Sequence, residues 1–552
     1  MLIRRRACAL LGLLVLVSCR DRADPAPAEG PPVAGGAAVI AEIGDLERPM
    51  PLVWSGNLDG DLVDIMYMGL TRMAWRDGAP AYLLADENPM AIAYRWQYAN
   101  ADSTALRYFM RSDLKWSDGH PITAADVVWT FQMMRDPRTA SPRLQDANLV
   151  ESVTAENDSV VVFQFRQRSP SMRFQAGLPI APRHVYGNVP ANRLMTHPVF
   201  ANPARMVVSG PFRVGRWSPN ERITLLPNPY FKVKPRLSAI VIRVIPDPTA
   251  RMTELETGTV DIIRPITTDH IRGLKERMPD VRILREEMRL WEFIAYNPTR
   301  VPAFADADVR RALGMAIDVP GIIRDLGLES FVAPAFGPYP PIFRDLFDPA
   351  RDRPLAHDPE GARRLLASRG WRDSDGDGVL DRDGQALRFT LLTNTGNQRR
   401  ADVSQLIQAQ WRAIGVDARL QRLDQATVMD RETGKEYEAV LNGWQVSLDP
   451  DLSVFFAPET EYNIVSYQDP EVTALMDRAR AAPTQETAAP LWRAAAERIV
   501  RDQPYTWLYY YDQLSAANDR VHGMKVDTYG AFQNTWEWWI PADRQRRAGR
   551  VQ

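Results

Sequence analysis

The chain has 552 residues, of which 45% are hydrophobic and 25% charged, and its formal net charge is −2. This balance is typical of a soluble globular protein, and the length is too great for a single hydrophobic core, so two or three domains are expected. The near-neutral charge provides no overall field for nucleic acid or for an anionic membrane surface, and neither is predicted as a binding partner.

The N-terminus has the features of an export signal. Three arginines at 4–6 precede an apolar run at 9–17, which is shorter than the roughly 20 residues of a membrane-spanning helix. Ser18 and Cys19 follow, and the segment resembles a bacterial lipobox. That resemblance implies removal of residues 1–18 and acylation of Cys19, which would anchor the protein at the periplasmic side of a cell-envelope membrane.

Cysteine usage agrees with export. Cys8 and Cys19 are the two cysteines of the chain. Cys8 would leave with the signal, so the mature fold is expected to have no disulfide, no cysteine metal site and no cysteine nucleophile. Residues 19–38 carry the acylated cysteine and are rich in Pro, Ala and Gly, which predicts a flexible tether before a globular part that starts at residue 39.

The globular part mixes strand and helix patterns, which predicts an α/β fold. Strands rich in Val, Ile, Leu and Phe are predicted at 158–165, 222–226, 239–245, 387–393 and 416–420. Helices are predicted from apolar spacing at 307–317, 359–369, 399–413 and 485–501. The stretch from 387 to 420 therefore reads β-α-β, with Gly415 just after the helix as its C-terminal cap.

Two helix starts are readable in detail. Asp118 and Gly119 form a tight turn, after which Thr123 is placed to cap a helix with Asp126 as the third residue of a capping box. Asp358 caps a second helix, whose first position is a proline. These features predict structure and imply no chemistry.

Several segments resemble, in order, the peptide, nickel and oligopeptide solute-binding proteins known as family 5. The most distinctive is LRYFMRSDLKWSDGHPITAADVVWTF at 106–131, with the family's W-x-D-G-x-P-x-T-A-x-D-V turn and helix. Further matching segments are at 209–231, 250–263, 296–318, 358–384, 406–416 and 503–512. The resemblance runs from about residue 50 to about residue 545.

The resemblance implies a two-lobed fold of the type II periplasmic-binding-protein kind, with an extra domain and a ligand cleft at the hinge between the lobes. Lobe I is expected to be discontinuous and domain II to be inserted into it. The expected boundaries are 39–80, 206–289 and 501–545 for lobe I, 81–205 for domain II and 290–500 for lobe III.

The function implied by the resemblance is ligand capture for an ABC importer. The expected partners are a peptide or similar polar solute and the permease subunits, with a monomeric chain, no cofactor and no catalysis. A non-peptide ligand such as an oligosaccharide, and an envelope receptor without a transporter, remain open. A periplasmic hydrolase is disfavoured because the sequence has no G-x-S-x-G, H-E-x-x-H or P-loop motif.

One segment is predicted to hold ligand. In peptide binders of the family, a G-W-x-x-D-x-x-D-P-D segment supplies an aspartate for the peptide's ammonium group. Here Ser447 stands at that position, and a buried ammonium without a carboxylate would cost several kcal/mol. Either Asp449 takes this role or the ligand has no free amino terminus. The predicted ligand-binding residues of this segment are Asn442, Trp444, Ser447, Asp449 and Asp451, with Trp444 expected to face the cleft.

For two sets of candidate ligand-binding residues, a structural interpretation stays open. Asp449 and Asp451 are also placed to start the helix that follows. Near the N-terminus of the globular part, Trp54, Asn57 and Tyr67 are further candidates to contact ligand, while core packing explains Tyr67 equally well.

No metal site is predicted. Asp373, Asp375 and Asp377 have the spacing of a calcium loop, but Gly384 replaces the bidentate glutamate at its twelfth position, which favours a solvated turn. The six histidines are scattered along the chain without a close pair.

Overall fold

The computed structural model describes residues 31–54, 56–76, 79–147, 149–348, 350–446 and 449–546. The predicted export signal, Cys19 and Ser447 lie outside these ranges. Within them, no helix combines the length and the apolar character needed to cross a membrane. The first strand, β1, begins at Ala37, so the globular part starts two residues earlier than the sequence predicts.

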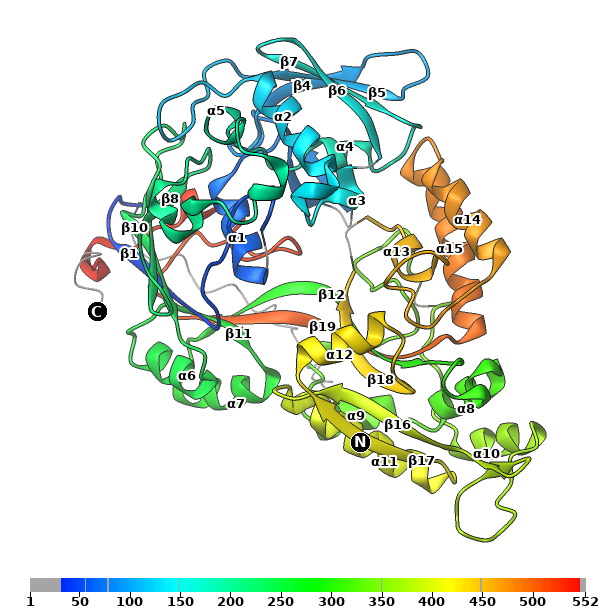
Figure 1. Cartoon of the computed structure of the whole chain (residues 1–552). Coiled ribbons are helices and arrows are strands. Elements are labelled where there is room, and N and C mark those ends of the chain that lie inside the picture. The colour runs from blue at the N-terminus through cyan, green and yellow to red at the C-terminus, as the bar shows by residue number, and fades with distance from the viewer. Residues whose placement is uncertain are drawn as a thin grey trace, which may run out of the picture.

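A large mixed sheet runs through the molecule (Figure 1). Its long central strands, β12 and β19, are antiparallel partners and cross the middle of the view, so both halves of the protein share them. In the described residues the order along the sheet is β17 (Asp417–Leu423), β16 (Arg388–Asn394), β18 (Ala439–Gln445), β12 (Arg282–Tyr296), β19 (Tyr505–Ala517), β11 (Ile262–Ile266), β1 (Ala37–Glu42), β10 (Ala239–Val244), β9 (Arg222–Pro227) and β8 (Phe212–Ser218). The short strand β13 (Val332–Pro334) pairs with β19 off this path.

Strand β1 shows why this sheet is covered on both faces. All six of its residues are buried. Ala38 and Ile40 join one apolar core, whereas Val39 and Ala41 join another, as expected for side chains that alternate between the two faces of a strand. A strand buried on both faces is expected to be a continuous apolar run, which the first five residues of β1, AAVIA, provide.

The β1 half of the sheet is called here the N-terminal lobe. Its helices are α1 (Gly56–Met66), α6 (Pro248–Glu256) and α7 (Thr268–Arg277). The other half, called the C-terminal lobe, contains β16, β17 and β18. Its helices are α8 (Ala307–Met315), α9 (Val319–Asp325), α10 (Pro359–Ser368), α11 (Gln398–Ala413), α12 (Gln425–Thr433), α13 (Ser453–Phe456), α14 (Pro470–Arg480) and α15 (Gln485–Asp502).

A second sheet lies above the N-terminal lobe in Figure 1 and forms, with its helices, the small-sheet unit. Its strand order is β4 (Ala93–Tyr98), β5 (Ala105–Met110), β7 (Val160–Phe165) and β6 (Val150–Asn157). Its helices are α2 (Ala124–Arg135), α3 (Leu144–Ala147), α4 (Met172–Ala176) and α5 (Arg183–Tyr186). The hairpin strands β2 (Arg72–Arg76) and β3 (Ala79–Leu83) connect it to the N-terminal lobe, and a two-residue pair, β14 (Asp381–Arg382) and β15 (Gln385–Ala386), lies in the C-terminal lobe.

The predicted local signals are confirmed. Strands β16 and β17 pair in parallel with α11 between them in sequence, and Gly415 has a φ of +84° at the predicted cap. The Asp358 side chain accepts a hydrogen bond from the backbone N–H of Gly361 at 2.7 Å, and the backbone N–H of Thr123 donates to Asp126 Oδ2 at 2.9 Å. Each of the predicted strands and helices is present, with ends that differ by a few residues.

Candidate functional site

A row of cavities separates the C-terminal lobe from the N-terminal lobe and the small-sheet unit. The one nearest the hinge has a volume of about 420 Å³ and is called the hinge cavity. Trp54 and Asn57 line it from the N-terminal lobe, and Gln445 lines it from the end of β18. Glu286 of β12 and Gln513 of β19 form its floor, so the shared central strands lie directly beneath it.

The next cavity, of about 410 Å³, has several aromatic rings in its lining and is called the aromatic cavity. Its wall on the small-sheet side contains Trp75, Tyr82, Trp96 and Arg173, and Phe343 faces them from the C-terminal lobe. Flat apolar rings with a few polar groups are the usual lining of a small-molecule site.

The third cavity, the outer cavity, has a volume of about 350 Å³. It shares Ser169, Ser171, Asp449 and Pro450 with the aromatic cavity, so the two are neighbouring parts of one cleft. Residues from both sides line every one of the three cavities. A solute in this cleft would contact both sides at once, which is the requirement for ligand-driven closure.

The Asp449 segment projects from the C-terminal lobe into the cleft. Asp449 Oδ1 accepts a hydrogen bond from the backbone N–H of Asp451 at 3.3 Å, and Asp451 Oδ1 accepts one from the N–H of Ser453 at 2.8 Å. Ser453 is the first residue of α13. Asp451 therefore acts at the start of this helix, as one of the two sequence interpretations proposed, and it also lines the outer cavity.

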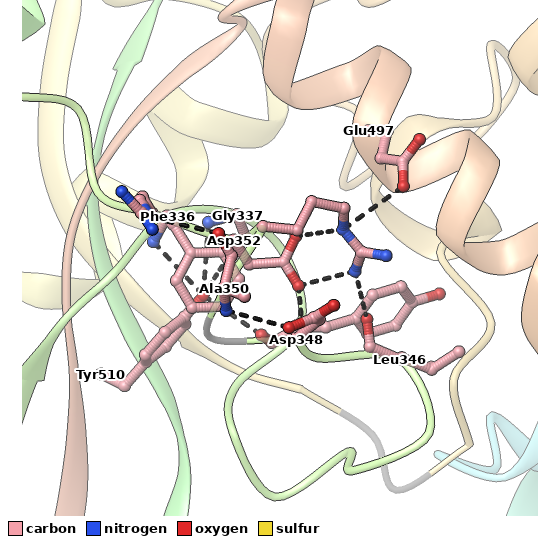
Figure 2. Close-up of polar contacts among 11 residues, drawn as sticks. Phe336, Gly337, Leu346, Asp348, Ala350, Asp352, Glu497 and Tyr510 are labelled. Atoms are coloured by element: carbon pink, nitrogen blue, oxygen red, sulfur yellow. Dashed lines mark hydrogen bonds and ion pairs between the residues drawn. The ribbon is translucent and has the colours of Figure 1, made fainter.

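A loop between β13 and α10 contacts this segment through a hydrogen bond from the Tyr339 hydroxyl to the Pro450 carbonyl. It carries Phe343 into the aromatic cavity. The Tyr510 hydroxyl, which is fully buried, donates to the Gly337 carbonyl at 2.7 Å and accepts from the Gly337 N–H at 3.3 Å (Figure 2). Farther along the loop, Arg351 forms ion pairs with Asp352 at 2.7 Å and Glu497 of α15 at 3.4 Å (Figure 2). The loop is thus attached to both the central sheet and a helix of the C-terminal lobe.

A buried ion cluster underlies the hinge cavity. The Arg264 guanidinium, which is 4% exposed, contacts Asp61 at 2.8 Å, Glu286 at 3.1 Å and Glu42 at 3.3 Å. Burial raises the pKa of Glu42 to about 7, although Arg264 opposes the shift. Because Asp61 lies in α1 and Glu286 in β12, Arg264 links the helix at the cavity wall to the strand at its floor.

The predicted site residues separate into two groups. Trp54 and Asn57 line the hinge cavity, Asp449 lines the aromatic and outer cavities, and Asp451 lines the outer cavity. Tyr67 is fully buried in the core of the N-terminal lobe, so the core-packing interpretation is the one that its surroundings favour.

Trp444 and Asn442 differ from the prediction. The Trp444 ring is 8% exposed and packs against Phe455 and Tyr462, with ring centroids 4.8 and 5.2 Å away. It belongs to an apolar core and lines none of the three cavities, so the expectation that it faces the cleft is wrong for this conformation. Asn442 is 1% exposed, and its side-chain N–H groups donate to both carboxylate oxygens of Glu432 at 2.8 Å.

The histidines also differ from the prediction. His120 and His184 stack with their ring centroids 4.2 Å apart, and both contact Asp118 Oδ2, at 3.2 and 2.7 Å. This trio could hold a metal ion, so the expectation that no two histidines come close is wrong. The three aspartates 373, 375 and 377 also lie within reach of one another, but each accepts backbone N–H groups of its own loop, as a solvated turn does.

Arg173, Trp75, Tyr82 and Trp96 line the aromatic cavity but were not predicted from the sequence, although a signal for part of this set exists. Strand β4 places Tyr94, Trp96 and Tyr98 on one face, and both tyrosines are more than 40% exposed. Aromatic side chains on the open face of a strand indicate a binding surface.

Comparison with known proteins identifies the fold. The family of bacterial extracellular solute-binding proteins, family 5, matches residues 88–463. The oligopeptide-binding protein AppA of Bacillus subtilis is 25% identical over 558 residues, which cover 97% of this chain and 99% of AppA. The oligopeptide-binding protein OppA of Lactococcus lactis subsp. lactis (strain IL1403) is 25% identical over 484 residues, which cover 79% of each chain.

Solved structures agree. AppA of Bacillus subtilis in complex with a nonapeptide superposes with a TM-score of 0.78, covering 93% of this chain and all of AppA. NikZ of Campylobacter jejuni in complex with Ni(L-His) gives 0.77 at 22% identity, covering 91% of this chain and 99% of NikZ, and supports the fold alone. The predicted type II periplasmic-binding-protein fold is therefore confirmed. The chain belongs to the bacterial extracellular solute-binding proteins of family 5.

Proposed function

We propose that this protein captures short peptides in the cell envelope and delivers them to the permease of an ABC importer. The observation that carries the proposal is the interlobe cleft, whose cavities are lined from both sides. The relatives AppA and OppA, which are named for oligopeptide binding, cover most of the chain and support the same ligand class.

Asp449 is the proposed anchor for the peptide's ammonium group. It is half-buried at the junction of the aromatic and outer cavities, where a carboxylate can meet a ligand that enters either one. A partly desolvated carboxylate–ammonium contact is stronger than one in water, and it compensates the ligand for its lost hydration.

Native mass spectrometry of residues 20–552, purified from cells, tests the ligand class. Release of a mixture of short peptides on denaturation is the expected result. A single non-peptide species, or an empty protein whose melting temperature no peptide changes, would contradict peptide capture. Asp449→Asn should weaken binding of peptides with a free amino terminus at least about tenfold. Asp430→Asn is the matched control, because Asp430 is exposed in the same lobe and lines none of the cavities.

Three further parts of the proposal concern the whole protein. Its lobes would divide at the boundaries predicted from the sequence, with β12 and β19 as the hinge. It would act as a monomer that is attached to the membrane only through lipid on Cys19. It would also turn over no substrate, so a panel of chromogenic esters, peptides and glycosides should remain intact.

A further inference from the structure

Two histidines and an aspartate of the small-sheet unit meet at its surface. His184 Nε2 lies 2.7 Å from Asp118 Oδ2, and His120 Nδ1 lies 3.2 Å from the same oxygen. The two imidazole rings stack with their centroids 4.2 Å apart and 24° between their planes. Three side chains that can each donate an electron pair to a metal ion therefore converge on one point.

The separations between these atoms suit a single bound cation. Imidazole and carboxylate ligands lie about 2.0–2.2 Å from Zn²⁺, so two ligand atoms of a tetrahedral ion are about 3.3 Å apart. The two nitrogen–oxygen distances are 2.7 and 3.2 Å, and all three ligand atoms lie within 4.8 Å of one another. Small side-chain rotations would therefore bring all three atoms onto one ion.

The backbone of the turn orients the Asp118 carboxylate toward the histidines. Gly119 has a φ of +92°, and its N–H donates to the Trp116 carbonyl at 2.9 Å, which closes the turn. The N–H of His120 donates to Asp118 Oδ1 at 3.2 Å, while Oδ2 meets the imidazoles. A hydrogen bond to the second oxygen is how proteins orient a carboxylate that binds a metal.

A buried carboxylate holds the His184 helix next to this turn. Asp126 is 4% exposed, and its Oδ1 accepts a hydrogen bond from the N–H of Arg183 at 2.9 Å. Asp126 lies in the first turn of α2, which follows the Asp118 turn, and Arg183 begins α5, which carries His184. Segments that are 66 residues apart are thereby held in a fixed relation, as a metal site requires.

We propose that Asp118, His120 and His184 bind one divalent transition-metal ion of the Zn²⁺, Ni²⁺ and Cu²⁺ class. Imidazole nitrogens select these ions over Mg²⁺ and Ca²⁺, which bind mainly oxygen ligands. Three protein ligands at an exposed position leave a coordination site for water. The ion would join the turn to α5, and because it binds only the folded chain it would stabilise that state.

This site is separate from the ligand cleft. In the described part of the chain, none of the three residues lines any of the three cavities. Helix α5 also lies on the side of the small-sheet unit away from α14 and α15 (Figure 1). Metal binding and peptide capture can therefore succeed or fail independently.

Calorimetric titration of Zn²⁺ into metal-free residues 20–552, purified without a histidine tag, tests the assignment. The wild type should bind one ion at this site, and Zn²⁺ should raise its melting temperature. His120→Asn should bind Zn²⁺ at least about a hundredfold more weakly, because losing even an outer partner of a ligand costs about 10–100-fold. The His120 side chain is 60% exposed, so without metal the variant should melt as the wild type does.

His357→Asn is the matched control. His357 is exposed in the C-terminal lobe, far along the chain from the trio. The variant should bind Zn²⁺ with the wild-type affinity. If both variants lose the same affinity, Zn²⁺ binds to scattered surface histidines and the assignment is overturned.

Pulsed electron paramagnetic resonance of bound Cu²⁺ counts the imidazole ligands directly. Cu²⁺ is the divalent first-row ion that such ligands bind most tightly. Two imidazoles are expected in the wild type and in His357→Asn, and one in His120→Asn. The site is overturned if the wild type binds Zn²⁺ no better than His120→Asn, or if Cu²⁺ has the same number of imidazoles in both. Peptide capture would stand in either case.

Discussion

The Tyr339 hydroxyl donates a hydrogen bond to the Pro450 carbonyl at 2.6 Å, and Tyr339 is 2% exposed. This contact joins the loop that carries Phe343 to the segment that carries Asp449. Two separate stretches of the C-terminal lobe are thereby held together as one wall of the cleft.

Tyr339→Phe should weaken ligand binding without touching the ligand. The change leaves the partly buried Pro450 carbonyl without this partner, which costs about 1 kcal/mol of unfolding free energy. It also frees the Asp449 segment to move, so the Kd for peptide should rise several-fold. Tyr437→Phe removes a similar buried bond, 2.9 Å from its hydroxyl to the Ile464 carbonyl, away from the cleft. It should lower the melting temperature and leave the Kd unchanged; equal effects of both variants on Kd would contradict a positioning role.

Glu432 should make stability fall as the pH rises. Burial raises the pKa of its carboxyl to about 7 in the folded state, and the donated hydrogen bonds of Asn442 only partly oppose this. The unfolded chain releases the same proton near its ordinary value of about 4.5. Between these values the folded state binds more protons, so stability is greatest below the unfolded pKa and decreases up to about pH 7.

Chemical denaturation of wild type and Glu432→Gln at about pH 5.5 and about pH 8 measures this effect. The variant should lose about 2 kcal/mol less unfolding free energy than the wild type over that interval. The exposed Glu436→Gln serves as control, since folding does not bury its carboxyl. Parallel profiles for wild type and Glu432→Gln would show that Glu432 is already ionised in the fold.

Replacement by phenylalanine should mainly reduce stability at Trp444 and mainly weaken ligand binding at Trp54. Trp444 lies in an apolar core, so Trp444→Phe should cost about 1–2 kcal/mol of stability and leave the Kd of the folded protein unchanged. Trp54 is only partly buried at the hinge cavity, so Trp54→Phe should raise the Kd with little change in melting temperature. If Trp444→Phe raises the Kd and Trp54→Phe does not, Trp444 contacts the ligand and this assignment is wrong.

Cys19→Ala should release the protein from the membrane. Each buried CH₂ of an acyl chain contributes about 0.8 kcal/mol, so several chains hold a protein in the membrane and an unacylated one has no such attachment. Fractionation of cells expressing wild type and Cys19→Ala, followed by immunodetection, should find the variant in the soluble envelope fraction. A variant that stays with the membranes would contradict the proposed lipid anchor.

The parts of the fold that could be predicted from the sequence are those set by residues close together in the chain. The β16–α11–β17 unit is contiguous in the chain, so its periodicities and its glycine cap are read within one short window. The position of Asp449 in the cleft came from the resemblance of a segment to a family. Trp444 could not be placed in this way, because β18 is buried on both faces and alternation does not tell which face meets the ligand.

Contacts between distant segments explain what could not be predicted. Asp118 and His184 are 66 residues apart, and they meet only because α5 packs beside the turn after β5. Arg173 and Asp449 belong to different parts of the fold, and they line the same cavity only because the two walls face each other. Neither pair of residues is linked by a repeat or a fixed spacing in the sequence, so neither contact could be predicted from it.

The central claim, that a solute binds between the two walls and draws them together, is tested most directly by a distance across the cleft. Residues 20–552 contain no cysteine, so spin labels can be attached to cysteines introduced at Ala155 and Ala474, which are exposed on β6 and α14. Double electron–electron resonance should show this distance shorten when a short peptide that binds in calorimetry is added, and stay constant in Asp449→Asn at the same concentration. An unchanged distance in wild-type protein that calorimetry shows to be saturated with peptide would contradict capture by closure.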